Sequence, residues 1–132
     1  NRKGYFLMIE SAIIDGYGHN NDSEGMKLEM YDFNNTLMLL VDYVHNHPNT
    51  LLVVTADHET GGTGIGYKSH EVGKRESLDL TFSTKGHTGT LVPVFAYGPG
   101  SECFAGIMKN IDIPKKLESL MKNDFKTRRS KM

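Results

Sequence analysis

Between residues 23 and 46, apolar side chains recur at steps of three and four, the spacing of one face of an amphipathic helix. That face consists of Met26, Met30, Phe33, Leu37, Leu40, Val41 and Val44. Asp22 or Ser23 can cap the N-terminus of this helix, and Pro48 prevents it from continuing. We therefore expect a helix from Ser23 to about Asn46 that packs on a sheet through Met30, Phe33, Leu37 and Val41.

Three short apolar runs, at residues 5–10, 51–55 and 91–96, have the length and composition of buried strands. A second amphipathic segment, 113–122, predicts a helix with Pro114 near its first turn. Strands and helices in this order are typical of an α/β fold. We expect the strands to form one mostly parallel sheet with covering helices.

Two regions between these elements are polar and rich in glycine. The segment "DGYGHNNDSEG" lies before the long helix and is expected to be a connecting loop. Residues 60–86 are expected to form a loop excursion, in which only "LDLTFS" alternates like an edge strand. A short helix is predicted near 102–109.

The chain has 132 residues, 38% of them hydrophobic, and is predicted to form one domain spanning 1–132. Its formal net charge of −1 gives no reason to expect nucleic acid or a membrane surface as partner. The apolar runs are far shorter than the ~18 residues that a membrane span needs. Because the chain begins with neither a signal peptide nor an initiator methionine, we expect a fragment of a longer protein.

Acidic and histidine side chains gather where the predicted strands end or begin. They are Glu10, Asp15, His19, Asp57, His58 and His87. Ligands of open α/β sheets bind at the carboxyl ends of the strands, where neighbouring strand ends lie close together. Nitrogen and oxygen donors suit zinc, and the carboxylates also suit magnesium. The pattern favours a hydrolase or mutase with two metal ions.

Each group by itself has a simpler interpretation. The "DH" pair can be a capping aspartate beside a surface histidine, and Asp15 with His19 can be a solvated pair. His87, between glycine and threonine, can be a turn residue. Glu10 is harder to explain, because a carboxylate at the end of an apolar strand is costly without a partner or an ion. The remaining histidines are expected at the surface: His45, His47 and His70.

Three stretches resemble the C-terminal part of alkaline phosphatases: "FLMIE" with the following "ID" and "GH", "VVTADHETGG", and "GHTGTLVPVFAYGPG". Their order, spacing and flanking residues agree from residue 4 to about residue 120. Cofactor-independent phosphoglycerate mutases and sulfatases share only parts of the pattern, and in those mutases the second motif typically ends in TADHG. The resemblance is therefore specific to the phosphatases.

The resemblance implies a role for all six candidate residues. Asp15, His19 and His87 match the family's ligands to a first zinc. Asp57 and His58 match ligands to a second zinc, and Glu10 matches a ligand to a magnesium. Members of the family hydrolyse phosphomonoesters through a covalent phosphoserine held between the two zinc ions. The resemblance further implies phosphomonoester substrates, a periplasmic or extracellular location and, as in many relatives, a homodimer.

The chain also departs from the family pattern. The nucleophile of the family lies in an Asp-Ser-Ala motif, which this sequence does not contain. The phosphate-gripping arginine and the other magnesium ligands have no counterpart either, so we expect a phosphomonoesterase whose present chain is inactive alone. Two alternatives stay open: a phosphomutase or sulfatase relative of the same superfamily, and a non-catalytic zinc-binding module.

Overall fold

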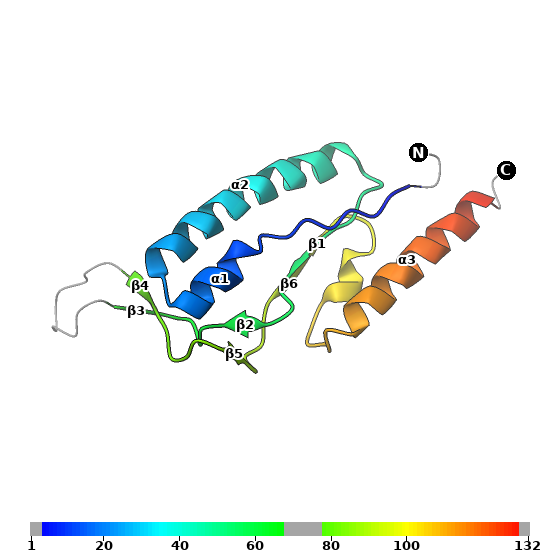
Figure 1. Cartoon of the computed structure of the whole chain (residues 1–132). Helices are drawn as coiled ribbons and strands as arrows, with labels where there is room; N and C mark the ends of the chain where they lie inside the picture. Colours follow the sequence, from blue (N-terminus) through cyan, green and yellow to red (C-terminus); the bar gives the residue numbers. More distant parts are fainter. Residues whose placement is uncertain (1–3, 68–77, 130–132) are drawn as a thin grey trace. The chain divides into compact units, whose positions relative to one another are not determined.

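A computed structural model describes residues 4–67 and 78–129 of the chain (Figure 1). Its elements, in chain order, are α1 (Ile13–Asn20), α2 (Ser23–Asn46), β1 (Leu52–Thr55), β2 (Glu59–Thr60), β3 (Gly64–Tyr67), β4 (Leu78–Thr81), β5 (His87–Thr88), β6 (Val94–Tyr97), the 3-10 helix η1 (Ser101–Phe104) and α3 (Asp112–Arg129). The strands pair as three two-stranded sheets, β1 with β6, β2 with β5 and β3 with β4. No helix in these described ranges is both long and apolar enough to cross a membrane.

Contacts divide the chain into two compact units. The first contains the residues up to Ile9, Val41–Val54 and those from Val94 on, and the second contains Glu10–Leu40 and Thr55–Pro93. All six predicted metal ligands belong to the second unit. The expectation of a single domain over 1–132, with an excursion over 60–86, stays a prediction.

The long helix α2 has the predicted bounds, Ser23–Asn46, and the predicted cap. The Gly25 N–H donates to the Asp22 carboxylate (3.0 Å), which satisfies one of the unpaired donors of the first turn. Its apolar face is covered only in part. Met26 is 7% exposed, whereas Met30 and Val41 are 47% and 43% exposed, so the expectation that these two residues pack on a sheet is wrong for the described elements.

The strand predictions have a mixed outcome. Strands β1 and β6 confirm two of the three, and β6 begins immediately after Pro93, which cannot donate a ladder hydrogen bond. The predicted strand at 5–10 is wrong, because residues 4–10 are in neither helix nor strand. Their apolar side chains are exposed, from 51% at Ile9 to 78% at Met8, and no described strand pairs with them.

The three described strand pairs also replace the single sheet that was expected. β2 with β5 and β3 with β4 are antiparallel, and each pair is separate. The "LDLTFS" prediction is confirmed by β4, which pairs with β3 in the excursion, while residues 68–77 and His70 lie outside the described residues. The mixture of helices and strands agrees with the α/β class.

Two helix expectations need correction and one is confirmed. The expected loop before α2 contains α1, which ends where Asn21 adopts the left-handed conformation (φ 55°). The helix predicted near 102–109 is only the 3-10 helix Ser101–Phe104, and Gly106 beyond it has a φ of 89°. Helix α3 confirms the predicted C-terminal helix, with Pro114 in its first turn.

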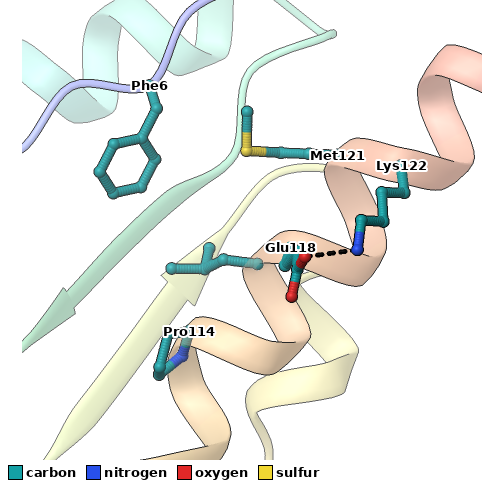
Figure 2. A pocket seen from close by; sticks show the side chains of 6 residues that line it. Phe6, Pro114, Glu118, Met121 and Lys122 are labelled. Atoms are coloured by element: carbon teal, nitrogen blue, oxygen red, sulfur yellow. Dashed lines mark hydrogen bonds and ion pairs between the residues drawn. The ribbon is translucent and has the colours of Figure 1, made fainter.

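The first unit contains an apolar groove between the extended N-terminal segment and α3 (Figure 2). Phe6 lines one side, and Pro114, Leu117 and Met121 of α3 line the other. The ion pair between Glu118 and Lys122, one helical turn apart on α3, borders the groove. Its lining offers no cluster of histidines or carboxylates, and the candidate metal ligands all belong to the second unit.

Candidate metal centre

The pairing of β2 with β5 brings His87 beside the "ADHET" motif. In this antiparallel pair Thr60 is opposite His87, and Glu59 is opposite Thr88. Residues directly opposite each other in such a ladder project their side chains to the same face of the sheet. His87 therefore lies next to residues that are far from it in the sequence.

Helix α1 lies against β2 at a buried glycine. A Cβ atom at Gly18 would come within 3.0 to 3.1 Å of the Thr60 side chain and carbonyl oxygen, so only glycine allows this approach without a shift. Asp15 and His19 are one helical turn apart on α1 and share a face. The close approach at Gly18 thus presents both residues to β2.

Asp15, His19 and His87 converge, as predicted. The His19 Nε2 atom is 3.5 Å from Asp15 Oδ2 and 3.2 Å from His87 Nε2, and His87 Nε2 is 3.7 Å from Asp15 Oδ1. Tetrahedral zinc with bonds of ~2.0–2.1 Å separates its ligand atoms by about 3.3 Å. These spacings fit one shared ion of that kind, with the two imidazoles each facing a different oxygen of the Asp15 carboxylate. We call these three residues the first subsite.

The hydrogen bonds around the first subsite set its protonation. His19 Nδ1 is 2.6 Å from the Lys85 carbonyl oxygen, which can only accept, so Nδ1 carries a proton and the neutral tautomer has its lone pair on Nε2. The hydrogen bond from the Thr60 hydroxyl lowers the pKa of Asp15, against a smaller rise from desolvation, and protonated His19, His87 and His58 would lower it further. An ionised carboxylate and an imidazole lone pair facing each other favour a proton or a metal cation between them.

Asp57 and His58 form the second subsite. The Asp57 Oδ2 and His58 Nε2 atoms are 3.4 Å apart, which also fits one shared ion, although the Asp57 side chain is 86% exposed. The His58 ring stacks on the ring of His87. Asp15, His58 and His87 each offer a ligand atom within 4.8 Å of the others, so the two subsites adjoin.

Glu10 is the predicted ligand that the described residues do not bring into this cluster. Its side chain is exposed, and no hydrogen bond or ion pair within the described ranges joins it to the other five. It stays a predicted magnesium ligand. It lies before α1, and a magnesium ion bound there would need further ligands besides Glu10.

Sequence reasoning gave no role to the two residues that follow Asp57 and His58. The Glu59 carboxylate accepts hydrogen bonds from the Thr88 hydroxyl and from the N–H groups of Thr63 (2.6 Å) and Gly62 (3.1 Å), and these bonds lower its pKa. The Thr60 hydroxyl donates to Asp15 Oδ1 (2.6 Å). Both residues belong to the quoted motif, but two of their partners, Thr88 and Asp15, are remote from it in sequence, so the motif alone does not reveal those contacts.

Comparison with known proteins identifies what the chain resembles. The family model for alkaline phosphatase matches residues 1–76, which include five of the six candidate ligands but not His87. Alkaline phosphatase 3 of Bacillus subtilis is 29% identical over 95% of the chain and 42% of its own length. Streptomycin-6-phosphate phosphatase of Streptomyces griseus is 30% identical over 84% of the chain and 28% of its own length. The chain thus spans less than half the length of these relatives.

Solved structures give the same result. The alkaline phosphatase of the Antarctic bacterium TAB5 has a TM-score of 0.79 and 40% identity over 86% of this chain and 34% of that one. The cold-active enzyme of a Shewanella species has a TM-score of 0.80 and 28% identity over 92% of this chain and 46% of that one. A TAB5 mutant was solved with magnesium bound in its M3 site. The fold is therefore alkaline-phosphatase-like.

Proposed function

The chain belongs to the alkaline phosphatase family, and on this basis we propose that it supplies the metal-binding part of a phosphomonoester hydrolase. The observation that carries the proposal is the convergence of Asp15, His19 and His87, with ligand atoms 3.2 to 3.7 Å apart. Three protein ligands with a fourth position open are typical of a catalytic zinc site.

The donor set supports a specific assignment of ions. Asp15, His19 and His87 would hold one zinc, Asp57 and His58 would contribute to a second, and Glu10 to a magnesium. Zinc, when bound, supplies a Lewis acid that neutralises negative charge on a phosphoryl group. The Lys85 carbonyl holds His19 with Nε2 directed at the cluster, and Thr60 favours the ionised form of Asp15.

We further propose that the serine nucleophile lies outside these 132 residues and that the chain alone is inactive. The sequence contains no Asp-Ser-Ala motif, and the chain spans 42% of the Bacillus relative. A metal site without a positioned nucleophile and a phosphate-binding arginine lacks the groups that form the covalent intermediate. The proposed substrates are phosphomonoesters.

The relatives reported above carry phosphatase names, which favours this activity over the phosphomutase and sulfatase alternatives. A non-catalytic zinc-binding module is contradicted if the chain restores catalysis in a related enzyme. On the family resemblance alone, we also propose a location outside the cytoplasm and a homodimer, which fractionation and sedimentation of the full-length protein would test.

A chimaera tests the proposal. The chain replaces the matching third of the TAB5 enzyme, to which it is 40% identical. The chimaera should release the coloured phenol from a chromogenic aryl phosphate. A chelator or the change His19→Ala should abolish this activity. The isolated chain should show no turnover. A folded, zinc-loaded chimaera without activity, or an isolated chain with enzymatic turnover, would contradict the proposal.

A further inference from the structure

We propose that Thr60 is a positioning residue that joins the two metal subsites, an inference that rests on the proposed function. Its hydroxyl donates to Asp15 Oδ1 (2.6 Å) and lies 3.2 Å from His58 Nδ1. Asp15 belongs to the first subsite and His58 to the second. One uncharged hydroxyl therefore contacts a ligand of each subsite without being a ligand itself.

The hydrogen bonds of Thr60 fix the positions of its hydroxyl proton and of the ring proton of His58. An ionised carboxylate only accepts, so the single hydroxyl proton of Thr60 is directed at Asp15. The hydroxyl oxygen then has only lone pairs left for His58, and His58 Nδ1 must carry a proton to donate to it. A neutral His58 consequently has its lone pair on Nε2, which is the atom that lies 3.4 Å from Asp57 Oδ2.

Its surroundings hold Thr60 in place. Its side chain packs against Gly18 of α1, and the Thr63 hydroxyl donates to its carbonyl oxygen (2.8 Å). Opposite it in the β2–β5 pair is His87. Thr60 thus lies where α1, β2 and β5 come together. Helix α1 and strand β5 contribute the ligands of the first subsite, and β2 carries Thr60 itself.

The consequence is that both subsites depend on this hydroxyl. Without it, His58 can adopt the other tautomer, with the proton on Nε2, and Asp15 loses the hydrogen bond that fixes its Oδ1 atom. Partners of this kind orient metal ligands, and their removal typically lowers metal affinity by ~10–100-fold.

The test uses the 132-residue chain with two substitutions at the same position. Thr60→Val removes the hydroxyl and keeps the shape, whereas Thr60→Ser keeps the hydroxyl and loses the methyl group. Thr81→Val, on β4 of the same unit, is the control for loss of a threonine hydroxyl away from the subsites. Zinc affinity is measured by competition with a chromogenic chelator. The tautomer of His58 in the metal-free chain is read from NMR shifts of its ring nitrogens, at a pH where imidazoles are neutral.

We expect Thr60→Val to weaken zinc binding by ~10-fold or more, and Thr60→Ser and Thr81→Val to stay within ~3-fold of the unchanged chain. In the metal-free state, His58 should carry its proton on Nδ1 in the unchanged and serine chains and lose this preference in the valine chain. Equal zinc affinity of the valine and unchanged chains, or equal losses for valine and serine, would overturn the inference.

The two readouts separate this inference from the proposed function. If the unchanged chain binds no zinc, the proposed metal site fails in this chain, and the His58 tautomer still decides the role of Thr60. If zinc binds but the tautomer is the same in the valine and unchanged chains, the metal site stands and the role of Thr60 is refuted. Circular dichroism of each chain confirms that it is folded.

Discussion

The imidazole of His87 stacks on that of His58, with ring centroids 3.6 Å apart and planes 22° from parallel. His87 belongs to the first subsite and His58 to the second, so the two subsites are in direct contact through these rings. Metal binding at one subsite therefore depends on the position of a ring from the other.

His19 should be essential for zinc binding, because its Nε2 atom faces both other members of the first subsite. We expect His19→Ala to reduce zinc affinity by more than the ~10–100-fold that is typical for loss of an orienting partner. His45→Ala is the matched control, since His45 is an exposed residue at the end of α2 in the other unit. Calorimetric titration of both variants would show the contrast, and equal affinities would refute the assignment of His19.

The isolated chain should bind about one zinc per monomer tightly and further metal weakly. The second subsite offers only two ligands, one of which is the highly exposed Asp57. Asp57→Asn should therefore leave the tight site within ~3-fold of its affinity and reduce the weak binding. Equilibrium dialysis gives the stoichiometry. Two tightly bound zinc ions per chain would show that the second subsite is more complete than the described residues indicate.

Glu59 should stabilise the fold in a pH-dependent manner. Hydrogen bonds from Thr88, Thr63 and Gly62 lower its pKa below the ordinary value that glutamate has in the unfolded chain, so the ionised form contributes its full stability above that ordinary value. The contribution is lost as the pH falls through the lower pKa of the folded state. Glu59→Gln should destabilise the metal-free chain at neutral pH, and the difference should shrink on acidification. Urea unfolding with chelator present at several pH values would show this trend, and a difference that is constant with pH would contradict it.

A side chain at Gly18 should displace the contact between α1 and β2. Gly18→Ala places a methyl group 3.0 to 3.1 Å from three Thr60 atoms, so we expect α1 to shift and zinc affinity to fall by ~10-fold. Gly16→Ala, in the same helix, meets nothing within 4 Å and should stabilise α1 by up to ~1 kcal/mol. Zinc titration and thermal unfolding of both variants separate the two effects. An unchanged affinity for Gly18→Ala would mean that the contact is not needed to position Asp15 and His19.

Met26 and Met30 lie one turn apart on the same predicted face of α2 but differ in burial. Met26 is 7% exposed and Met30 is 47% exposed. Met26→Ala should cost ~2–5 kcal/mol in the free energy of unfolding, because it leaves a cavity. Met30→Ala should change that free energy by less than ~1 kcal/mol. Denaturant titration compares them directly, and similar losses would show that Met30 is covered in solution.

Local sequence was sufficient for the elements that depend on near neighbours. The bounds of α2 follow from its apolar spacing and from Asp22, and the strand predicted at 91–96 is found as β6, although it begins only after Pro93. Helix periodicity and capping act over a few residues, so the sequence displays them directly. The candidate ligands were likewise found from their motifs, without knowledge of any distance between them.

Tertiary contacts decided everything that depends on remote partners. Residues 5–10 have the composition of a strand, yet composition cannot supply a neighbouring strand, and none of the described strands pairs with them. The polar segment around Asp15 is a helix that lies against Thr60 at Gly18, a contact that no local pattern encodes. Thr60 itself acquires significance only when Asp15, His58 and His87 surround it. Hydrogen bonds and close packing depend on where residues lie in space, and the linear order of the sequence does not specify those positions.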